Sequence, residues 1–334
     1  MNRIVRIFIV LSGILFFVLV GVSVGVLNSV ERTVRTPIST GERHRTIFHF
    51  IAYVPSMERD LFYIRAYNGM KEIAEKERSA LQVFEYTPGE GYDVLARTLQ
   101  LIADVSPDGV ILALPQGNNY DSAIVPINKK GIPIVTLEND LPSSKRSAHV
   151  GTNAFELGRL AGQAVAARFP GKANIGLLIS MNGGVNSPRD ATFLQGFRQI
   201  FREFPALELT LVRSSSNEQT GGGEEFIRQI LTSYPTINVA VFTNSRDAEG
   251  AAQTLIEFGR VGTPAILAFD DTPEIRKFIE TGVILATISR NAEEAGREAM
   301  TSLLALAKNE RTNAYRDPGA TILTNVDLAQ RKQP

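Results

Sequence analysis

The sequence of 334 residues contains no cysteine, no tryptophan and only three histidines, and its 35 basic side chains balance 35 acidic ones. Without cysteine the chain has no disulfide bond, no thiol nucleophile, no cysteine-ligated zinc and no lipidated cysteine. The histidines, His44, His49 and His149, lie far apart and include no pair with the spacing of metal ligands. A net charge of zero argues against broad binding to nucleic acids, because such binding requires a basic surface. Much ordinary catalytic chemistry is thereby excluded.

Hydrophobic residues, by contrast, make up 44% of the sequence. This content is sufficient for packed cores and too high for an intrinsically disordered protein. The length corresponds to about two domains of ordinary size. We therefore expect a folded protein with two domains.

An apolar run without charged side chains extends over residues 7–30, after Arg3 and Arg6. It is longer than the roughly 20 residues that a helix needs to cross a bilayer. A core helix of this length would show a polar face, and this run shows none. We expect the segment to enter a membrane or to direct export.

Two interpretations of the apolar run are open. It is either an uncleaved signal anchor or a signal peptide that is cut after Ser23 or Gly25. We favour the anchor because the run continues past both sites. Residues 7–30 would then hold a single-pass protein in the lipid bilayer of the cell membrane. Residues 31–45 would form a polar linker, and the rest of the chain would lie on the extracytoplasmic side.

After residue 46, short runs rich in β-branched residues alternate with amphipathic segments. The predicted strands cover residues 47–53, 81–86, 109–114, 133–137, 174–179, 209–213, 239–243, 265–269 and 285–288, with a last extended piece at 321–323. These strands are nearly continuously apolar, as expected for parallel sheets buried on both faces. The pattern restarts near residue 150, where Asn153 and Glu156 form a capping box. The predicted fold class is α/β, with two doubly wound Rossmann-like lobes.

In open sheets of this kind, ligands bind beyond the carboxyl ends of the strands. In the first half of the chain, Asp60, Phe62 and Tyr63 follow the first strand, and Glu138 and Asn139 follow the fourth. The aromatic pair suits stacking on an apolar ligand face, and a carboxylate beside an amide suits adjacent hydroxyl groups. The alternatives are ordinary packing of a helix start that Asp60 caps, and a simple turn after the fourth strand.

In the second half, Arg189 lies in the first turn of a predicted helix, and Asn244, Asp270 and Arg290 follow successive strands. Planar groups that donate and accept hydrogen bonds in one plane suit a polyhydroxyl ligand. We expect Asp270 to lie between Arg189 and Arg290, because buried charges need partners. The alternative for Arg189 is a surface position with an acidic partner on its own helix. Since acids alternate with arginines, we expect no metal site.

Several stretches together, none of them specific alone, resemble a known family. They are Val150-Gly151-Thr152-Asn153 and residues 156–162, 189–197, 243–244, 269–274 and 286–288. With them the chain resembles the type I periplasmic sugar-binding proteins, the ribose- and xylose-binding group, which is related to the ligand cores of lac-repressor-type regulators. The resemblance covers nearly everything from Thr46 to Val326. It implies two lobes that close on a ligand by a hinge motion. The lobes would be joined by three crossovers, near Val150, Arg290 and Pro318.

The resemblance also implies roles for individual residues. Phe62 matches an aromatic position that stacks on the pyranose ring, and Tyr63 falls where a second aromatic side chain usually lies. Arg189, Asn244 and Asp270 match the arginine, asparagine and aspartate that bind ring hydroxyls. These residues imply a polar pocket for a sugar.

Other positions depart from the family pattern. Asp60 stands where the ribose binders have asparagine, and Glu138-Asn139 stands where the family typically has Asp-Arg. Arg290 replaces a glutamine of the ribose binders, at a position where the xylose binders also have a basic residue. An aldopentose such as xylose or ribose is the expected ligand on the strength of the resemblance.

The division that the resemblance implies places residues 46–149 and 291–317 in an N-terminal lobe, and residues 150–290 and 318–330 in a C-terminal lobe. We expect an exported, membrane-tethered protein that closes on a monosaccharide and acts as the sugar sensor of a membrane partner such as a histidine kinase. The alternative is the substrate-binding component of an ABC sugar importer, which delivers sugar to a permease.

An enzyme on a Rossmann-like frame is a more distant alternative. No G-x-G-x-x-G pattern follows the first strand, and the sequence offers no Ser–His or Cys–His constellation. We therefore expect no enzymatic activity, no cofactor and no nucleic-acid partner.

Overall fold

Two six-stranded sheets form the cores of two lobes in a computed structural model that describes residues 47–115, 120–180, 188–214 and 222–331. The sheet of the N-terminal lobe contains, in spatial order, β11 (Tyr315–Arg316), β5 (Ala148–Val150), β4 (Ile134–Leu137), β3 (Gly109–Leu112), β1 (His49–Pro55) and β2 (Ala80–Tyr86). The sheet of the C-terminal lobe contains β12 (Ala320–Thr324), β10 (Ile284–Arg290), β9 (Ala265–Phe269), β8 (Val239–Val241), β6 (Ala173–Ser180) and β7 (Leu207–Ser214). Neighbouring strands are parallel, except that β12 runs antiparallel to β10.

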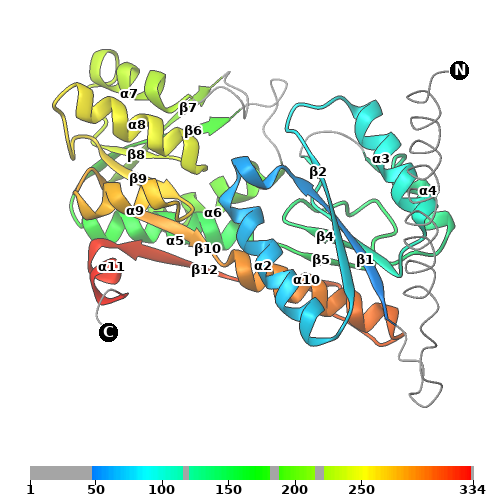
Figure 1. Ribbon diagram of the computed structural model, residues 1–334. Helices are drawn as coiled ribbons and strands as arrows, with labels where there is room; N and C mark the ends of the chain where they lie inside the picture. Colours follow the sequence, from blue (N-terminus) through cyan, green and yellow to red (C-terminus); the bar gives the residue numbers. More distant parts are fainter. Residues whose placement is uncertain (1–46, 116–119, 181–187, 215–221, 332–334) are drawn as a thin grey trace, which may run out of the picture. The chain divides into compact units, whose positions relative to one another are not determined.

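Helices cover both faces of the N-terminal sheet (Figure 1). The pair α2 (Leu61–Lys76) and α10 (Ala292–Ala307) packs on one face, and α3 (Tyr92–Val105) and α4 (Val125–Lys129) pack on the other. Along β1, Phe50 and Ala52 contact the first pair, whereas Ile51 and Tyr53 contact the second. Both faces of the strand are buried, which explains why its sequence is continuously apolar.

The C-terminal lobe repeats this arrangement. One face of its sheet packs against α5 (Ala154–Arg168) and α6 (Pro188–Glu203). The other face packs against α7 (Gly223–Thr232), α8 (Ser245–Glu257), α9 (Pro273–Glu280) and α11 (Asn325–Arg331). The two lobes therefore have the α/β architecture with parallel sheets that the sequence predicts.

The chain passes between the two sheets three times. It leaves the N-terminal sheet after β5 and enters α5, it returns from β10 into α10, and it passes directly from β11 to β12. Each lobe is consequently assembled from two separate stretches of the sequence.

Helices α5 and α6 approach each other so closely that only glycine can occupy two facing positions. A Cβ atom on Gly158 would lie 2.0 Å from the carbonyl oxygen of Phe193, and one on Gly196 would lie 1.9 Å from that of Phe155. Real Cβ atoms do not come this close to backbone, so each glycine gives the backbone of the opposite helix room to approach. The glycines thus fix how α5 and α6 pack together.

Within the residues that the structure describes, no helix is both long and apolar enough to cross a bilayer. The anchor predicted at residues 7–30 and the linker predicted at residues 31–45 lie outside the described residues.

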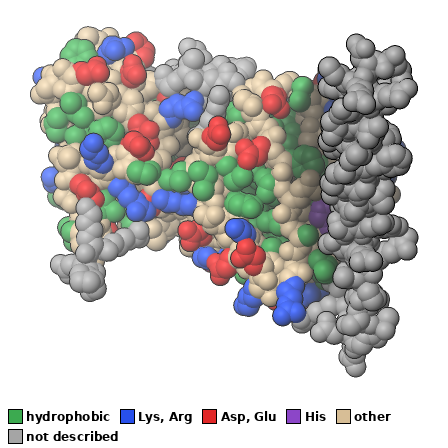
Figure 2. All heavy atoms as spheres, viewed as in Figure 1, with side chains coloured by type: hydrophobic (Ala, Val, Ile, Leu, Met, Phe, Trp, Pro, Cys, Tyr) green, Lys and Arg blue, Asp and Glu red, His purple; other side chains and the backbone are tan. Residues whose placement is uncertain are grey.

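Acidic and basic side chains are interspersed over the face shown in Figure 2. Hydrophobic side chains lie among them on the same face. This mixture agrees with the formal net charge of +0. Among the described residues on this face, the figure therefore shows no broad basic area of the kind that binding to nucleic acid requires.

Candidate ligand-binding cleft

A cleft of about 660 Å³ is lined by residues of both lobes. Every residue that the sequence analysis proposes as ligand-binding lines it: Asp60, Phe62, Tyr63, Glu138, Asn139, Arg189, Asn244, Asp270 and Arg290. The structure thus brings these residues together from separate strand and helix ends. Their contacts with a ligand remain a prediction.

Two acidic residues occupy equivalent places in the two lobes. Glu138 follows β4 and Asp270 follows β9, and both have a left-handed backbone with φ of 61°. The Glu138 N–H donates to the carbonyl of Val150 at 2.8 Å, and the Asp270 N–H donates to that of Ile288 at 2.9 Å. Residues other than glycine rarely adopt this conformation, and such local strain concentrates at functional sites. We infer that the strand ends are shaped to place these two carboxylates.

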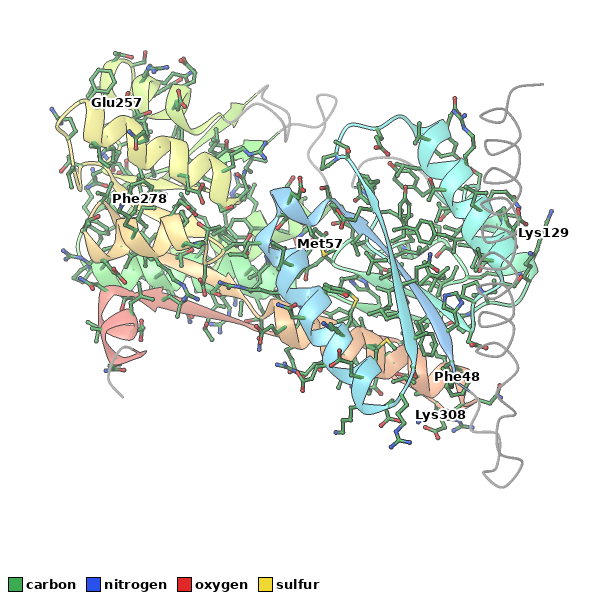
Figure 3. The ribbon with its side chains drawn as sticks, viewed as in Figure 1. Phe48, Met57, Lys129, Glu257, Phe278 and Lys308 are labelled. Atoms are coloured by element: carbon green, nitrogen blue, oxygen red, sulfur yellow. The ribbon has the colours of Figure 1, made fainter. Side chains whose placement is uncertain are left out.

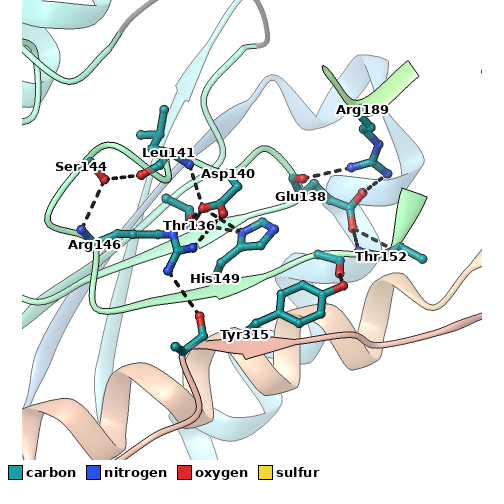
Figure 4. A network of polar contacts seen from close by, with 12 residues as sticks. Thr136, Glu138, Asp140, Leu141, Ser144, Arg146, His149, Thr152, Arg189 and Tyr315 are labelled. Carbon is teal, nitrogen blue, oxygen red and sulfur yellow. Dashed lines mark hydrogen bonds and ion pairs between the residues drawn. The ribbon is translucent and has the colours of Figure 1, made fainter. Parts of the chain in front are cut away.

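The Glu138 carboxylate, whose side chain is only 2% exposed, is fully engaged by protein groups. Its Oε2 atom accepts from Arg189 Nη2 and from Arg290 Nη1, each at 2.8 Å. Its Oε1 atom accepts from the backbone N–H of Thr152 at 3.0 Å and from the Thr152 hydroxyl at 3.1 Å. Arg189 Nη1 also donates to the Glu138 carbonyl oxygen at 2.9 Å (Figure 4). Burial alone would raise the pKa of Glu138, but the two arginines outweigh it and lower the pKa to about 2.

Arg290 connects the equivalent acids of the two lobes. Its Nε and Nη2 atoms donate to the two oxygens of Asp270, each at 2.7 Å, while Nη1 reaches Glu138. Its guanidinium carbon lies 4.2 Å from the centre of the Phe62 ring, so the cation stacks on the aromatic face. Burial opposes its charge, but Asp270 and Glu138 hold the pKa of Arg290 well above its ordinary value. The guanidinium is therefore fixed in position and permanently charged.

The expected partnership of Asp270 with both arginines is wrong. Asp270 binds Arg290, whereas Arg189 pairs with Glu138 of the other lobe. The alternative of a surface position for Arg189 is also wrong, because its side chain is only 23% exposed and pairs with Glu138 of the other lobe. The reason is geometric: the end of β4 lies between the two arginines, which no local pattern in the sequence reveals.

The aromatic pair serves the packing of the helix start as well as the lining of the cleft. The Phe62 and Tyr63 rings meet edge to face, with centres 5.2 Å apart. Tyr63 is buried in the core, and burial raises the pKa of its hydroxyl. Asp60 caps α2 as predicted, since its Oδ1 atom accepts from the Phe62 N–H at 2.9 Å. Burial also raises the pKa of the Asp60 carboxyl, as do the neighbouring acids Asp270 and Glu138.

Both asparagines of the predicted site bind the protein itself. The Asn139 side-chain nitrogen donates to the carbonyl of Leu114 at 2.8 Å. The Asn244 oxygen caps α8 by accepting from the Asp247 N–H at 2.8 Å, and its nitrogen donates to the Asp247 carboxylate at 2.7 Å. The capping role of Asn244 could have been predicted, because asparagine just before a helix is a common N-cap.

Further polar residues contribute to the cleft without having been predicted. Thr152 lies behind the cleft and holds Glu138 in place, and its signal in the sequence was the stretch of residues 150–153 that carries the family resemblance. Arg65 and Asp271 also line the cleft and pair with each other across the lobes. The sequence gives no sign of that pair, because the two residues are 206 positions apart.

Beside Glu138, a second polar network ties together the first crossover and β11 (Figure 4). Asp140 pairs with Arg146, and the Thr136 hydroxyl lies 3.0 Å from His149 Nδ1. The His149 ring stacks on Tyr315, whose hydroxyl donates to the Gly151 carbonyl at 3.0 Å. Burial lowers the pKa of His149. This network fixes the strand ends at the point where the chain passes between the lobes.

Among the described residues, no group of three or more histidine, cysteine, aspartate or glutamate side chains could hold a metal ion. The charges of the cleft are instead arranged as acid–arginine pairs. Such an arrangement offers both donors and acceptors to a polar ligand.

Comparison with known proteins identifies the family. The model of the periplasmic binding protein domain matches residues 51–311. The chain belongs to this family. The resemblance inferred from the sequence is thereby confirmed, and because members are substrate-binding proteins rather than enzymes, the expectation of a non-enzymatic role is confirmed as well.

Individual relatives are distant but cover most of the chain. The ribose import binding protein RbsB of Escherichia coli is 22% identical over 270 residues, which are 79% of this chain and 86% of the relative. The solved structure of GanP, a glucose-galactose binding protein from Geobacillus stearothermophilus, has a TM-score of 0.75 and 25% identity, covering 85% of this chain and 99% of that one. A XylFII–LytSN complex mutant has a TM-score of 0.64 and 21% identity, covering 85% and 100%. The similarity to these solved structures agrees with the two-lobe fold of this chain.

Proposed function

We propose that the cleft binds one monosaccharide and that the two lobes close on it. The observation that carries this proposal is the convergence of aromatic, arginine, amide and carboxylate side chains from both lobes on a single cleft. Its volume of about 660 Å³ lies within the usual range for small-molecule sites. The relatives named for ribose import and for glucose and galactose binding support a sugar as the ligand.

The chemistry of the cleft suits a neutral sugar. Asp270 and Arg290 present a carboxylate and a guanidinium in a fixed, bidentate pair, and the remaining lone pairs of Asp270 can accept from ring hydroxyls. Phe62 supplies an aromatic surface beside this pair. An aldopentose such as ribose or xylose remains the ligand that we propose.

We further propose that the moving units are residues 46–149 with 291–317, and residues 150–290 with 318–330. The three passages of the chain between the sheets support this division, because they are the only covalent links between the lobes among the described residues. The network around His149 lies at two of these passages and would keep the two connecting segments in a fixed position relative to each other.

The protein is proposed to lie outside the cytoplasm, as its family suggests, and to be held in the membrane by residues 7–30. The support for the anchor is the length and uncharged character of this segment in the sequence. Detection of the unprocessed chain in the membrane fraction would agree with an anchor, whereas a mature N-terminus near Val24 would contradict it.

Between the two roles for a tethered binding protein, we favour sensing. The similarity to a XylFII–LytSN complex supports a role in which the closed lobes are presented to a signalling partner. The similarity to a ribose import binding protein supports delivery to a permease instead. A deletion strain separates them: loss of the sugar-induced transcriptional response with normal sugar uptake indicates sensing, and loss of uptake indicates import.

The binding proposal is tested by thermal unfolding of the full chain in mild detergent. The chain is mixed with D-ribose, D-xylose, D-arabinose, D-allose, D-glucose, D-galactose and xylitol in turn. A ligand at roughly 100 times its dissociation constant stabilises a protein by about 2.7 kcal/mol, which raises the unfolding temperature by several degrees. One sugar that raises it supports the proposal and identifies the ligand. A panel without any shift contradicts binding of a simple sugar.

A further inference from the structure

A second ionic contact between the lobes lies at the cleft, separate from Glu138. Arg65 is on α2 of the N-terminal lobe, and Asp271 follows β9 of the C-terminal lobe. Arg65 Nη2 donates to the Asp271 carbonyl oxygen at 2.9 Å, and Nη1 lies 3.2 Å from Oδ2 of its carboxylate. The Arg65 side chain therefore binds both the backbone and the side chain of Asp271 in the other lobe.

Asp271 is held in place by its own lobe. Arg276 on α9 donates to both carboxylate oxygens, from Nε at 2.6 Å and from Nη2 at 2.7 Å, and the Ser289 hydroxyl lies 3.4 Å from Oδ2. The side chain of Asp271 is 4% exposed. A carboxylate fixed in this way loses little conformational freedom when a cation from the other lobe reaches it. Asp271 is thus a preformed acceptor for Arg65.

The Glu138 contact is also made by an acid fixed within one lobe and arginines of the other, but the two lobes exchange roles. There the N-terminal lobe provides the acid, Thr152 fixes it, and the C-terminal lobe provides Arg189 and Arg290. In the Arg65 contact the C-terminal lobe provides the acid and the N-terminal lobe provides the cation. Neither Arg65 nor Asp271 belongs to the residues proposed to bind sugar.

We propose that Arg65 and Asp271 form a latch that stabilises the closed arrangement of the lobes and thereby sets the affinity for sugar. The part that concerns affinity rests on the proposed binding function. An ion pair that exists only when the lobes are together raises the fraction of molecules in that arrangement. Because a ligand that bridges both lobes binds only that fraction, its apparent dissociation constant falls in proportion. Arg65 is in this sense an affinity-setting residue.

The lobe distance can be measured directly because the sequence contains no cysteine. Lys129 on α4 and Glu257 on α8 are exposed residues of different lobes, and both are labelled in Figure 3. A variant with K129C and E257C takes spin labels at these positions alone. The distribution of distances between the labels is measured by pulsed electron resonance on the full chain in mild detergent.

The test variant is Arg65→Gln, and the matched control is Arg297→Gln. Arg297 has a similar exposure, 30% against 26% for Arg65, and its ion pairs with Glu72, Glu293 and Glu294 stay within the N-terminal lobe. Without sugar, Arg65→Gln shifts the distribution to longer distances, and so does about 0.5 M NaCl in the unsubstituted chain, since salt weakens partly exposed ion pairs. Arg297→Gln keeps the original distribution.

Calorimetric titration with the sugar that stabilises the chain gives the second readout. Arg65→Gln raises the dissociation constant by about fivefold to fiftyfold, Arg65→Lys raises it less, and Arg297→Gln leaves it unchanged. Distance distributions of Arg65→Gln and Arg297→Gln that both equal the original would overturn the latch. A panel in which no sugar binds would reject the binding function, whereas the distance comparison would still decide whether the latch exists.

Discussion

The Glu138 carboxylate lies between two guanidinium groups of the other lobe and beside the Thr152 backbone. Each of its two oxygens already accepts two hydrogen bonds from protein groups. Its main role is therefore to position Arg189 and Arg290 rather than to bind a ligand directly. The Glu138 side chain reaches across to both arginines.

Removing the charge of Glu138 is expected to destabilise the fold. Glu138→Gln keeps the shape but leaves two partly buried guanidinium groups without their shared acid, which costs about 2–3 kcal/mol of the free energy of unfolding. This figure is at the low end for buried pairs because Arg189 and Arg290 reach some solvent. Urea unfolding at pH 7 measures it. Glu156→Gln, which removes only a surface pair with Arg159, changes the free energy by no more than about 0.5 kcal/mol.

The effect of Glu138 depends on pH in a defined direction. Its pKa is about 2 in the folded chain, against 4.5 for the ordinary group, so the folded state binds fewer protons between these values. The stabilisation is complete above about pH 4.5 and is lost as the pH falls toward about 2. The difference in stability between Glu138→Gln and the unsubstituted chain therefore shrinks over this range. A difference that stays constant would contradict the assigned ion pairs.

The positions of the cleft residues could be predicted because they follow from the strand pattern. Parallel strands place their carboxyl ends at one edge of a sheet. Glu138 and Asp270 directly follow such strands, Arg290 is the last residue of one, and Asn244 lies three residues beyond another. Their partners could not be predicted. Glu138 and Arg290 are 152 positions apart and meet only because the lobes come together. The sequence pattern carries no information about that distance.

Helices α5 and α6 depend on glycine where their backbones approach. Replacing Gly196 by alanine tests this. Alanine favours a helix by about 1 kcal/mol over glycine, yet its Cβ would lie 1.9 Å from the Phe155 carbonyl oxygen. Because a backbone atom cannot rotate away, overpacking of about 1–3 kcal/mol or more dominates. We expect the unfolding temperature of Gly196→Ala to fall.

Gly171 provides the control for that substitution. An added Cβ at this position meets nothing within 4 Å, and no unusual φ constrains it. Gly171→Ala is therefore expected to change the unfolding temperature little or to raise it slightly. If Gly196→Ala proved as stable as Gly171→Ala, the close packing of α5 on α6 would be wrong.

Among the strands, those that lie in an apolar run of four or more residues could be predicted. The apolar runs that became β1, β6, β9 and β10 are five to eight residues long and stand out from the helices between them. The strands β5 and β11 have three and two residues and do not stand out in the sequence, whereas β8, also of three residues, could be predicted because its apolar run continues through Phe242. The extended piece predicted at residues 321–323 is part of β12, but its antiparallel pairing with β10 could not be read from its sequence.

In the protein as a whole, two sets of acid–arginine contacts join the lobes, and each lobe provides the acid in one set and the arginine in the other. A polar network lies where the chain passes between the lobes. Glu138 receives cations from the C-terminal lobe, Asp271 receives one from the N-terminal lobe, and Tyr315 ties β11 to the first crossover. These contacts join the two lobes across the cleft. If the lobes close on a ligand as we propose, breaking these contacts changes the relative position of the lobes.

The central claim, that this cleft binds the sugar through its charged residues, is tested most directly by isothermal titration calorimetry. The sugar that stabilises the full chain is titrated into the unsubstituted protein, into Asp270→Asn and into the exposed control Asp93→Asn. Asparagine tolerates the left-handed backbone of residue 270, so the fold is retained. We expect Asp270→Asn to bind about 10- to 100-fold more weakly, since a charged hydrogen bond contributes roughly 1.5–3 kcal/mol, and Asp93→Asn to bind normally. Equal binding by Asp270→Asn and the unsubstituted protein would contradict the account.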